Sequence, residues 1–186
     1  MEPADERTLL RRWQAGDLDA LAELIARWQD PVARFAARIV GRDRAADVCQ
    51  ETFLRLMRSA EDYRERGRFA AWLFQVALNA ARDDRRQRQR AERRDLAGLR
   101  SPPVEPPDLA CERAELVRTV ESAVAELPAS QREVLALRHD AGLGFEEMSR
   151  LLGAPASTLK SRFAAALDRL RTRLAELGFH AVENRP

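Results

Sequence analysis

The sequence predicts an all-α fold in which two small helical domains are joined by a proline-rich linker. Three observations predict it: good helix formers dominate the composition, apolar residues recur at helical spacing, and prolines cluster in a segment that breaks this spacing. Ala, Leu, Arg and Glu are abundant, and only 8 of the 186 residues are glycine. Apolar residues make up 45% of the chain, which is enough to build packed cores.

Residues 1–94 form the first predicted domain, as a series of amphipathic helices. Asp17 is a plausible N-cap for the second helix, and Pro31 is expected to kink or split that helix. Asp43 opens the next helix. The helix that starts at Phe69 has the cleanest apolar stripe in the chain and continues into an arginine-rich stretch, where that stripe ends.

Residues 95–110 are interpreted as an acidic linker. They carry four prolines close together, at positions 102, 103, 106 and 107. Such a cluster forbids a continuous helix and favours extended backbone. An ordered loop lying over one domain is the alternative, but almost no large apolar side chain is present to anchor it, so a linker is favoured.

The second predicted domain covers residues 111–177, and residues 178–186 form a tail. Pro128 should break the first helix of this domain. Ser130 and Glu133 have the three-residue spacing of a capping box, which predicts that the next helix opens there.

The later part of this domain has the layout of a DNA-binding helix-turn-helix. A short helix covers Phe145–Leu152, Gly153 makes the turn, and Pro155 suits the first position of a longer helix. Such a second helix lies in the major groove and presents the polar residues of its first turns to base edges. An ordinary helical hairpin is the alternative, but the small polar residues at the start of the helix favour DNA. The candidates for duplex reading are Ser157, Thr158, Lys160, Ser161 and Arg162, with Arg169 at phosphates.

The charge distribution is more informative than the formal net charge of +2. Two basic segments, residues 82–94 and 155–174, flank an acidic one at residues 95–131. Clustered positive charge on helices is typical of nucleic-acid binding, although two solvated helix faces would look the same.

The sequence also sets expectations for chemistry and location. Cys49, Cys111, His139 and His180 lack metal-ligand spacing, so we expect no metal and no cofactor. We find no nucleophile elbow or glycine-rich phosphate loop, which argues against an enzyme with a small-molecule substrate. No apolar run approaches membrane-spanning length and no signal-peptide pattern is present, so a cytoplasmic protein is expected.

Four segments, in order along the chain, resemble the motifs of one known family. Asp47–Phe53 is similar to a core-polymerase-binding helix, and Gly67–Asp83 to the adjoining promoter-melting helix. Leu127–Leu137 is similar to the start of a C-terminal domain, and Glu146–Arg162 to its helix-turn-helix. In order and spacing, and without a further domain between the two parts, they resemble extracytoplasmic-function sigma factors of the sigma-70 family.

The resemblance implies a role for each part of the chain. Residues 1–94 would be sigma region 2, which binds the clamp helices of the polymerase's largest subunit and recognises and melts the minus-10 element. Residues 111–177 would be region 4, which meets the flap of the second-largest subunit and reads the minus-35 element as duplex. Members of this group are typically held inactive by an anti-sigma factor, often at the membrane, so we expect such a partner besides core RNA polymerase and promoter DNA.

The resemblance also implies site residues in the first domain. For core polymerase binding they are Asp47, Gln50 and Glu51. For the minus-10 element they are Tyr63, Arg64 and Arg68 from a loop, and Asn79, Arg82, Asp83 and Arg86 from a helix. Aromatic rings and arginines suit exposed bases and backbone, and an amide suits a base edge. This sequence departs from the family's pattern at Leu78, where a basic residue is usual.

Three rival functions come from the same residues. A stand-alone helix-turn-helix regulator would bind duplex operators without polymerase, but would need neither Asp47–Phe53 nor the Arg68–Asp83 segment. A nuclease or another enzyme is disfavoured, because the sequence shows no recognisable catalytic cluster. A helical scaffold or an anti-sigma protein would leave the basic helix start at Lys160 unexplained.

Overall fold

The computed structural model describes residues 5–59, 63, 69–95 and 112–179, with the helical backbone alone at 92–95 and 112–116. These residues contain eight helices and no strand, which confirms the all-α prediction. Arg64, Arg68, Cys111 and nearly all of the predicted linker lie outside the described residues.

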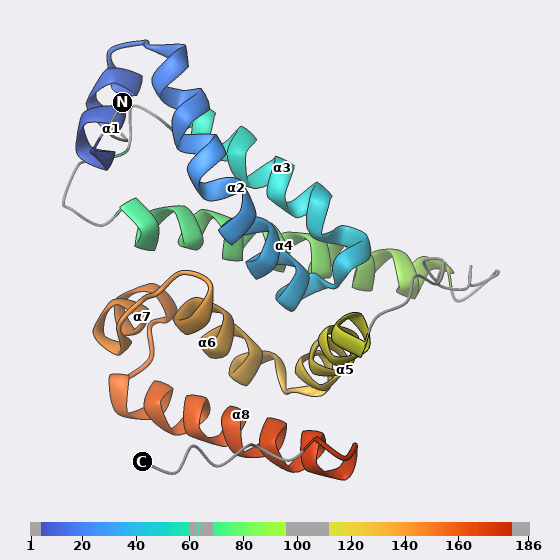
Figure 1. The fold of residues 1–186 in the computed structure, drawn as a ribbon. Coiled ribbons are helices and arrows are strands. Elements are labelled where there is room, and N and C mark those ends of the chain that lie inside the picture. The colour runs from blue at the N-terminus through green and yellow to red at the C-terminus, as the bar shows by residue number, and fades with distance from the viewer. Residues whose placement is uncertain (1–4, 60–62, 64–68, 96–111, 180–186) are drawn as a thin grey trace.

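The first four helices form the upper half of the molecule (Figure 1). They are α1 (Glu6–Gln14), α2 (Leu18–Val40), α3 (Arg42–Arg58) and α4 (Phe69–Asp95). Helix α2 lies at the centre of this half, because it packs against α1, α3 and α4. Helix α4 crosses beneath α2 and α3 and faces the other half.

Local chemistry explains where α2 begins. The Asp17 carboxylate accepts hydrogen bonds from the backbone N–H groups of Asp19 and Ala20, at 3.0 and 3.1 Å, which confirms the predicted N-cap. These backbone bonds, together with Arg12, lower the pKa of Asp17.

Helix α2 continues through Pro31 to Val40, so of the two expected outcomes, a kink or a split, the split is wrong. A proline inside a helix costs about 3 kcal/mol, whereas burying one large apolar side chain contributes about 1.5–3 kcal/mol. Leu24 before the proline and Phe35 after it are both buried in the same core. Packing of both halves of the helix on one core therefore outweighs the missing hydrogen bond.

The last four helices form the lower half (Figure 1). They are α5 (Glu112–Glu126), α6 (Ala129–His139), α7 (Phe145–Leu152) and α8 (Ala156–Glu176). The predicted capping box at Ser130 is wrong, because the N-cap of α6 is Pro128, two residues earlier, and no side chain caps the helix there. Glu147 instead accepts a hydrogen bond from the backbone N–H of Gly144, at 2.9 Å, at the start of α7.

The predicted helix-turn-helix layout is present in α7 and α8. Gly153 ends α7 with φ 65, in the left-handed region that favours glycine. Leu159 is fully buried, and the Phe163 ring packs edge-on against Phe145 at 5.8 Å. These contacts fix α8 to its domain and leave its opposite face exposed.

Buried apolar residues of both halves form one continuous cluster, which runs from Leu9 and Phe35 to Met148 and Leu159. The contacts that join the halves are made by α2 with α5 and α6, and by α4 with α7. The isolated chain is therefore closed, with its two halves packed together. None of the helices described is long and apolar enough to cross a membrane.

Candidate polymerase and nucleic-acid interfaces

The exposed face of α3 carries the residues predicted to bind core polymerase. Asp47 and Gln50 are exposed and Glu51 is half-buried, while Val48 and Thr52 point into the core. The carboxylates are partly neutralised on their own helix: Asp47 accepts a hydrogen bond from Arg44, and Glu51 accepts one from Arg55 at 2.7 Å.

Two apolar side chains extend this face, and the sequence analysis missed them. Leu54 is 38% exposed and Met57 is 49% exposed. They lie four and seven residues after Gln50, which places them on the same side of the helix. Their spacing from Gln50 is readable from the sequence, but the sequence analysis assigned no role to either side chain. The α3 face thus combines polar groups with an apolar end.

Acidic residues of α4 hold it to α3. Asp84 pairs with Arg44 at 2.8 Å, and Asp83 pairs with Arg55 at 2.9 Å. Asp83, a predicted minus-10 residue, therefore positions the helix in this structure.

Tyr63, another predicted minus-10 residue, is only 5% exposed. Its ring lies 4.7 Å from that of Trp72 and 5.6 Å from that of Phe69. Gln14 donates a hydrogen bond to its backbone carbonyl at 2.7 Å. The structure therefore places Tyr63 in the core, where its ring cannot stack on a base.

The other predicted residues of α4 share one side of the helix, at positions 79, 82, 83 and 86. Asn79 and Arg86 are exposed, and Arg82 is half-buried. The Arg82 guanidinium makes two hydrogen bonds to the Glu133 carboxylate of α6, at 2.7 and 3.3 Å. Leu78 beside them is buried in the core, so the departure from the family's usual basic residue lies on the packed side.

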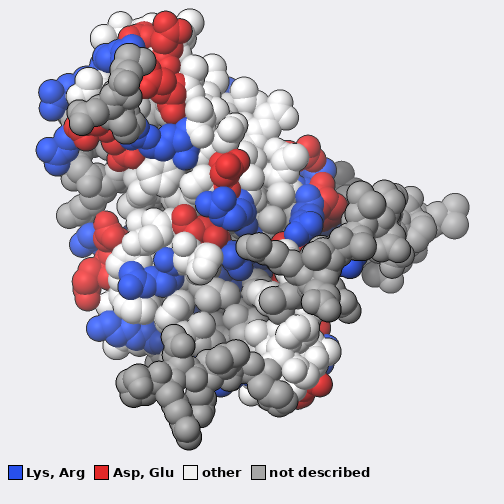
Figure 2. Space-filling model, viewed as in Figure 1, with Lys and Arg blue, Asp and Glu red and all other residues white. Residues whose placement is uncertain are grey.

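The start of α8 presents the predicted duplex-reading residues in the open. Ser157, Lys160, Ser161 and Arg169 are exposed, and Thr158 and Arg162 are half-buried. The Lys160 ammonium lies 5.9 Å from the centre of the Phe145 ring, and the Arg138 guanidinium lies 5.6 Å from it. Figure 2 shows basic and acidic side chains side by side in this part of the molecule, and α7 itself carries Glu146 and Glu147 besides Arg150. A helix N-terminus with Lys160 and Arg138 nearby suits phosphates and base edges.

Family comparisons match both halves of the chain. The model of sigma-70 region 2 matches residues 24–91, and the model of sigma-70 region 4 matches residues 118–170. The chain belongs to the extracytoplasmic-function sigma factors of the sigma-70 family. ECF RNA polymerase sigma-E factors from Haemophilus influenzae and Escherichia coli K12 are 28% and 27% identical to it. Each alignment covers 95% of this chain and at least 97% of the relative.

Solved structures of sigma factors have the same fold. CnrH, in complex with the cytosolic domain of CnrY, matches with a TM-score of 0.69 and 27% identity, over 92% of this chain and 97% of that chain. RpoE from Bartonella quintana, in complex with the anti-sigma factor NepR, also has a TM-score of 0.69, at 23% identity, over 83% of this chain and 96% of that chain. The residues that match the region 2 model lie in α2–α4, and those that match the region 4 model lie in α5–α8.

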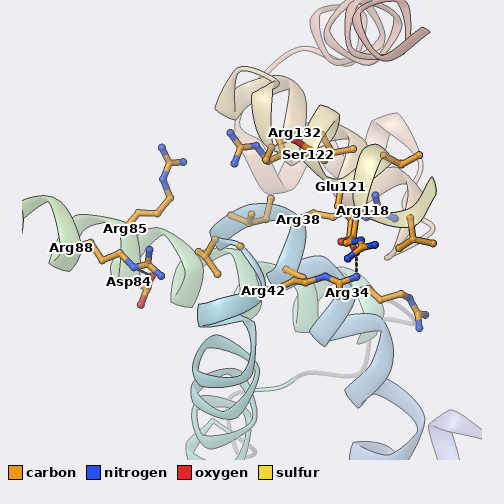
Figure 3. A pocket seen from close by; sticks show the side chains of 18 residues that line it. Arg34, Arg38, Arg42, Asp84, Arg85, Arg88, Arg118, Glu121, Ser122 and Arg132 are labelled. Atoms are coloured by element: carbon orange, nitrogen blue, oxygen red, sulfur yellow. Dashed lines mark hydrogen bonds and ion pairs between the residues drawn. The ribbon is translucent and has the colours of Figure 1, made fainter. Parts of the chain in front are cut away.

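A cleft of about 990 Å³ lies between region 2 and region 4 (Figure 3). Its walls come from α2 and α4 on one side and from α5 and α6 on the other, and Ile39, Val40, Val120 and Val124 supply apolar surface. Arginines line it from both sides, at positions 34, 38, 42, 85, 88, 118 and 132, with Asp84 and Glu121 as the lining carboxylates. Burial and the nearby Arg85 charge lower the pKa of Arg132.

The sequence analysis did not find this cleft, because its residues come from helices on both sides of the linker. Over the described part of the chain, no cluster of three or more His, Cys, Asp or Glu side chains could hold a metal ion.

Proposed function

We propose that this protein binds core RNA polymerase and directs it to promoters, without catalysing a reaction itself. The observation that carries the proposal is the presence of two different DNA-suited helix surfaces on one sigma chain, on α4 and at the start of α8. We assign residues 1–94 to region 2, 95–110 to the linker, 111–177 to region 4 and 178–186 to the tail.

The α3 face is the proposed site for the clamp helices of the polymerase's largest subunit. Asp47, Gln50 and Glu51 supply polar recognition, while Leu54 and Met57 supply apolar area. Charged groups at an interface favour specificity and fast association, whereas buried apolar anchors carry more of the affinity. Region 4 is proposed to meet the flap of the second-largest subunit.

Region 2 is proposed to melt and hold the minus-10 element through α4. Melting takes a base out of the stack, which costs a few kcal/mol that protein contacts to the base must offset. Asn79 suits a base edge, and Arg82 and Arg86 suit phosphates. Arg64 and Arg68 remain proposed loop contacts. Tyr63 would contribute only if it left its core position.

Region 4 is proposed to read the minus-35 element as duplex. Ser157, Thr158, Lys160, Ser161 and Arg162 stand at the start of α8, where a recognition helix meets base edges. Arg169, two turns further along, would contact a phosphate. Because the two domains are tethered, binding of one raises the effective concentration of the other at its own element.

An anti-sigma factor is the proposed regulator. The similar protein CnrH was solved in complex with the cytosolic domain of CnrY, so a related chain has a protein partner. The chain is proposed to act in the cytoplasm, at the nucleoid when active and at the inner membrane when a membrane-bound partner holds it.

Reconstituted transcription tests the function. The purified chain with core polymerase should give transcripts that start at defined promoters, and core polymerase alone should not. A stand-alone regulator would instead protect duplex DNA from nuclease without polymerase. Random starts with the chain present, or tight operator binding by the chain alone, would contradict the proposal.

A further inference from the structure

Among the residues that the structure describes, three ion pairs join region 2 to region 4 in the closed chain. Arg82 of α4 pairs with Glu133 of α6 at 2.7 Å, and Arg38 of α2 pairs with Asp140 at 2.8 Å. Arg42 pairs with Glu121 of α5 at 2.6 Å. In each pair the arginine comes from region 2 and the carboxylate from region 4.

The three pairs differ in their surroundings. The Asp140 side chain is fully buried, and its carboxylate also lies 3.1 Å from His139. Glu133 is largely buried and receives two hydrogen bonds from one guanidinium, a fork geometry that favours Arg–carboxylate pairing. Both partners of the Arg42–Glu121 pair are exposed to solvent, so that pair adds little. Glu133 and Asp140 therefore make the two more buried of these three ion pairs.

The closed form cannot engage both promoter elements at once. Elements centred about 25 base pairs apart are separated by about 85 Å along straight duplex, at about 3.4 Å per base pair. In the closed chain α7 packs on α4, and α8 packs on α7. Two steps of helix packing span only about 20 Å. Region 4 must therefore leave region 2 before both surfaces can bind.

We propose that Glu133 is an internal competitor of promoter DNA, which keeps Arg82 occupied until region 4 moves away. Its carboxylate takes the place of the DNA phosphate that Arg82 is proposed to bind, and Asp140, through Arg38, anchors the C-terminal end of the same helix to region 2. The inference rests on the proposed function of Arg82. It adds that the chain restrains itself, before any anti-sigma factor binds.

Self-closure lowers the apparent affinity of the chain for its partners. A ligand that needs the open form binds more weakly in proportion to the open fraction. Removing the two carboxylates should raise that fraction without changing any group that touches DNA or polymerase. The paired variant Glu133→Gln with Asp140→Asn preserves side-chain shape and removes both charges.

The matched control is Glu126→Gln with Glu176→Gln. It also removes two carboxylates from region 4, but both of these pair with Arg173 inside the same domain. The change in net charge is identical, so any general gain in DNA attraction appears in both variants. Circular dichroism confirms that each variant keeps its helices. The variant Arg38→Gln removes the ion pair with Asp140 from the region 2 side. It replaces the paired variant in the experiments if the paired variant fails to fold.

Small-angle X-ray scattering of the free chain gives the first readout. The wild-type chain and the control should share a radius of gyration near the value of about 16 Å expected for a compact chain of 186 residues. The Glu133→Gln, Asp140→Asn variant should be clearly larger. Equal radii in all three proteins would overturn the inference.

Transcription at limiting sigma concentration gives the second readout. The variant should reach half-maximal promoter-specific transcription at about three- to tenfold lower concentration than wild type, and the control should match wild type. If wild type transcribes and the variant shows no gain, self-competition is wrong and the proposed function stands. If wild type itself gives no promoter-specific transcript, the proposed function fails, while the scattering experiment still tests closure.

Discussion

The start of α8 and the exposed side of α4 carry similar chemistry but lie in different surroundings. Both present basic and amide or hydroxyl side chains on one side of a helix. At α8, Lys160 and Ser161 are open to solvent, whereas at α4 the Arg82 guanidinium is already bound by Glu133. Similar side chains on two helices can therefore differ in whether another part of the chain already binds them. Under the proposed function, region 4 can meet duplex DNA in the closed chain, whereas Arg82 of region 2 must first be released from Glu133.

The largest effect is expected at the open surface. Lys160→Ala with Arg162→Ala should weaken minus-35 binding by roughly 1–3 kcal/mol for each side chain that reaches a base, because nothing competes for these side chains. Promoter-binding titrations with holoenzyme measure the weakening. Arg171→Ala is the control, since Arg171 is exposed on the same helix but pairs with Asp168 near its far end. Unchanged promoter selection in the double variant would remove these residues from the reading surface.

A smaller effect is expected on α4, where Glu133 already binds Arg82. Asn79→Ala should lower the stability of the melted complex by about 1–3 kcal/mol, the range for one well-made base contact. The effect should appear in holoenzyme, as reduced permanganate reactivity of unpaired thymines, and not in duplex binding by the free chain. Gln87→Ala is the control, because Gln87 is an exposed residue about two turns further along the same helix. Equal melting by Asn79→Ala and wild type would show that Asn79 makes no base contact.

The sequence predicts features that depend on neighbouring residues, but not those that depend on residues far apart in the chain. The Asp17 cap and the α7–α8 layout follow from neighbours within a few residues, so spacing alone predicts them. Glu133 was assigned to a capping box by the same local logic, but its carboxylate binds Arg82, 51 positions away. Tyr63 was placed on the DNA side because a loop tyrosine has no periodic signal of burial, yet three neighbouring aromatic and polar groups hold it in the core.

The family resemblance supplied the rest of the predicted site. Like the local patterns, it misses contacts between residues that are distant in the sequence. It assigns roles by position in a motif, so it named Asp47, Gln50 and Glu51 but not the apolar neighbours on the same side of α3. It also treats each domain by itself, so it contains no information about a cleft or ion pairs between domains. Only packing of the two halves brings Arg38 beside Asp140.

The smallest effect is expected on the exposed face of α3. Leu54→Ala with Met57→Ala should weaken binding to core polymerase by about 1 kcal/mol or more for each anchor, because each truncated side chain would bury less apolar area against the clamp. The free energy of unfolding should change little, since both side chains are partly exposed. Asp47→Ala with Gln50→Ala should weaken core binding less, through the association rate and its salt dependence. Fluorescence anisotropy measures the affinity of each double variant for core polymerase. A larger loss of affinity from the polar pair than from the apolar pair would mean that recognition on α3 is electrostatic rather than apolar.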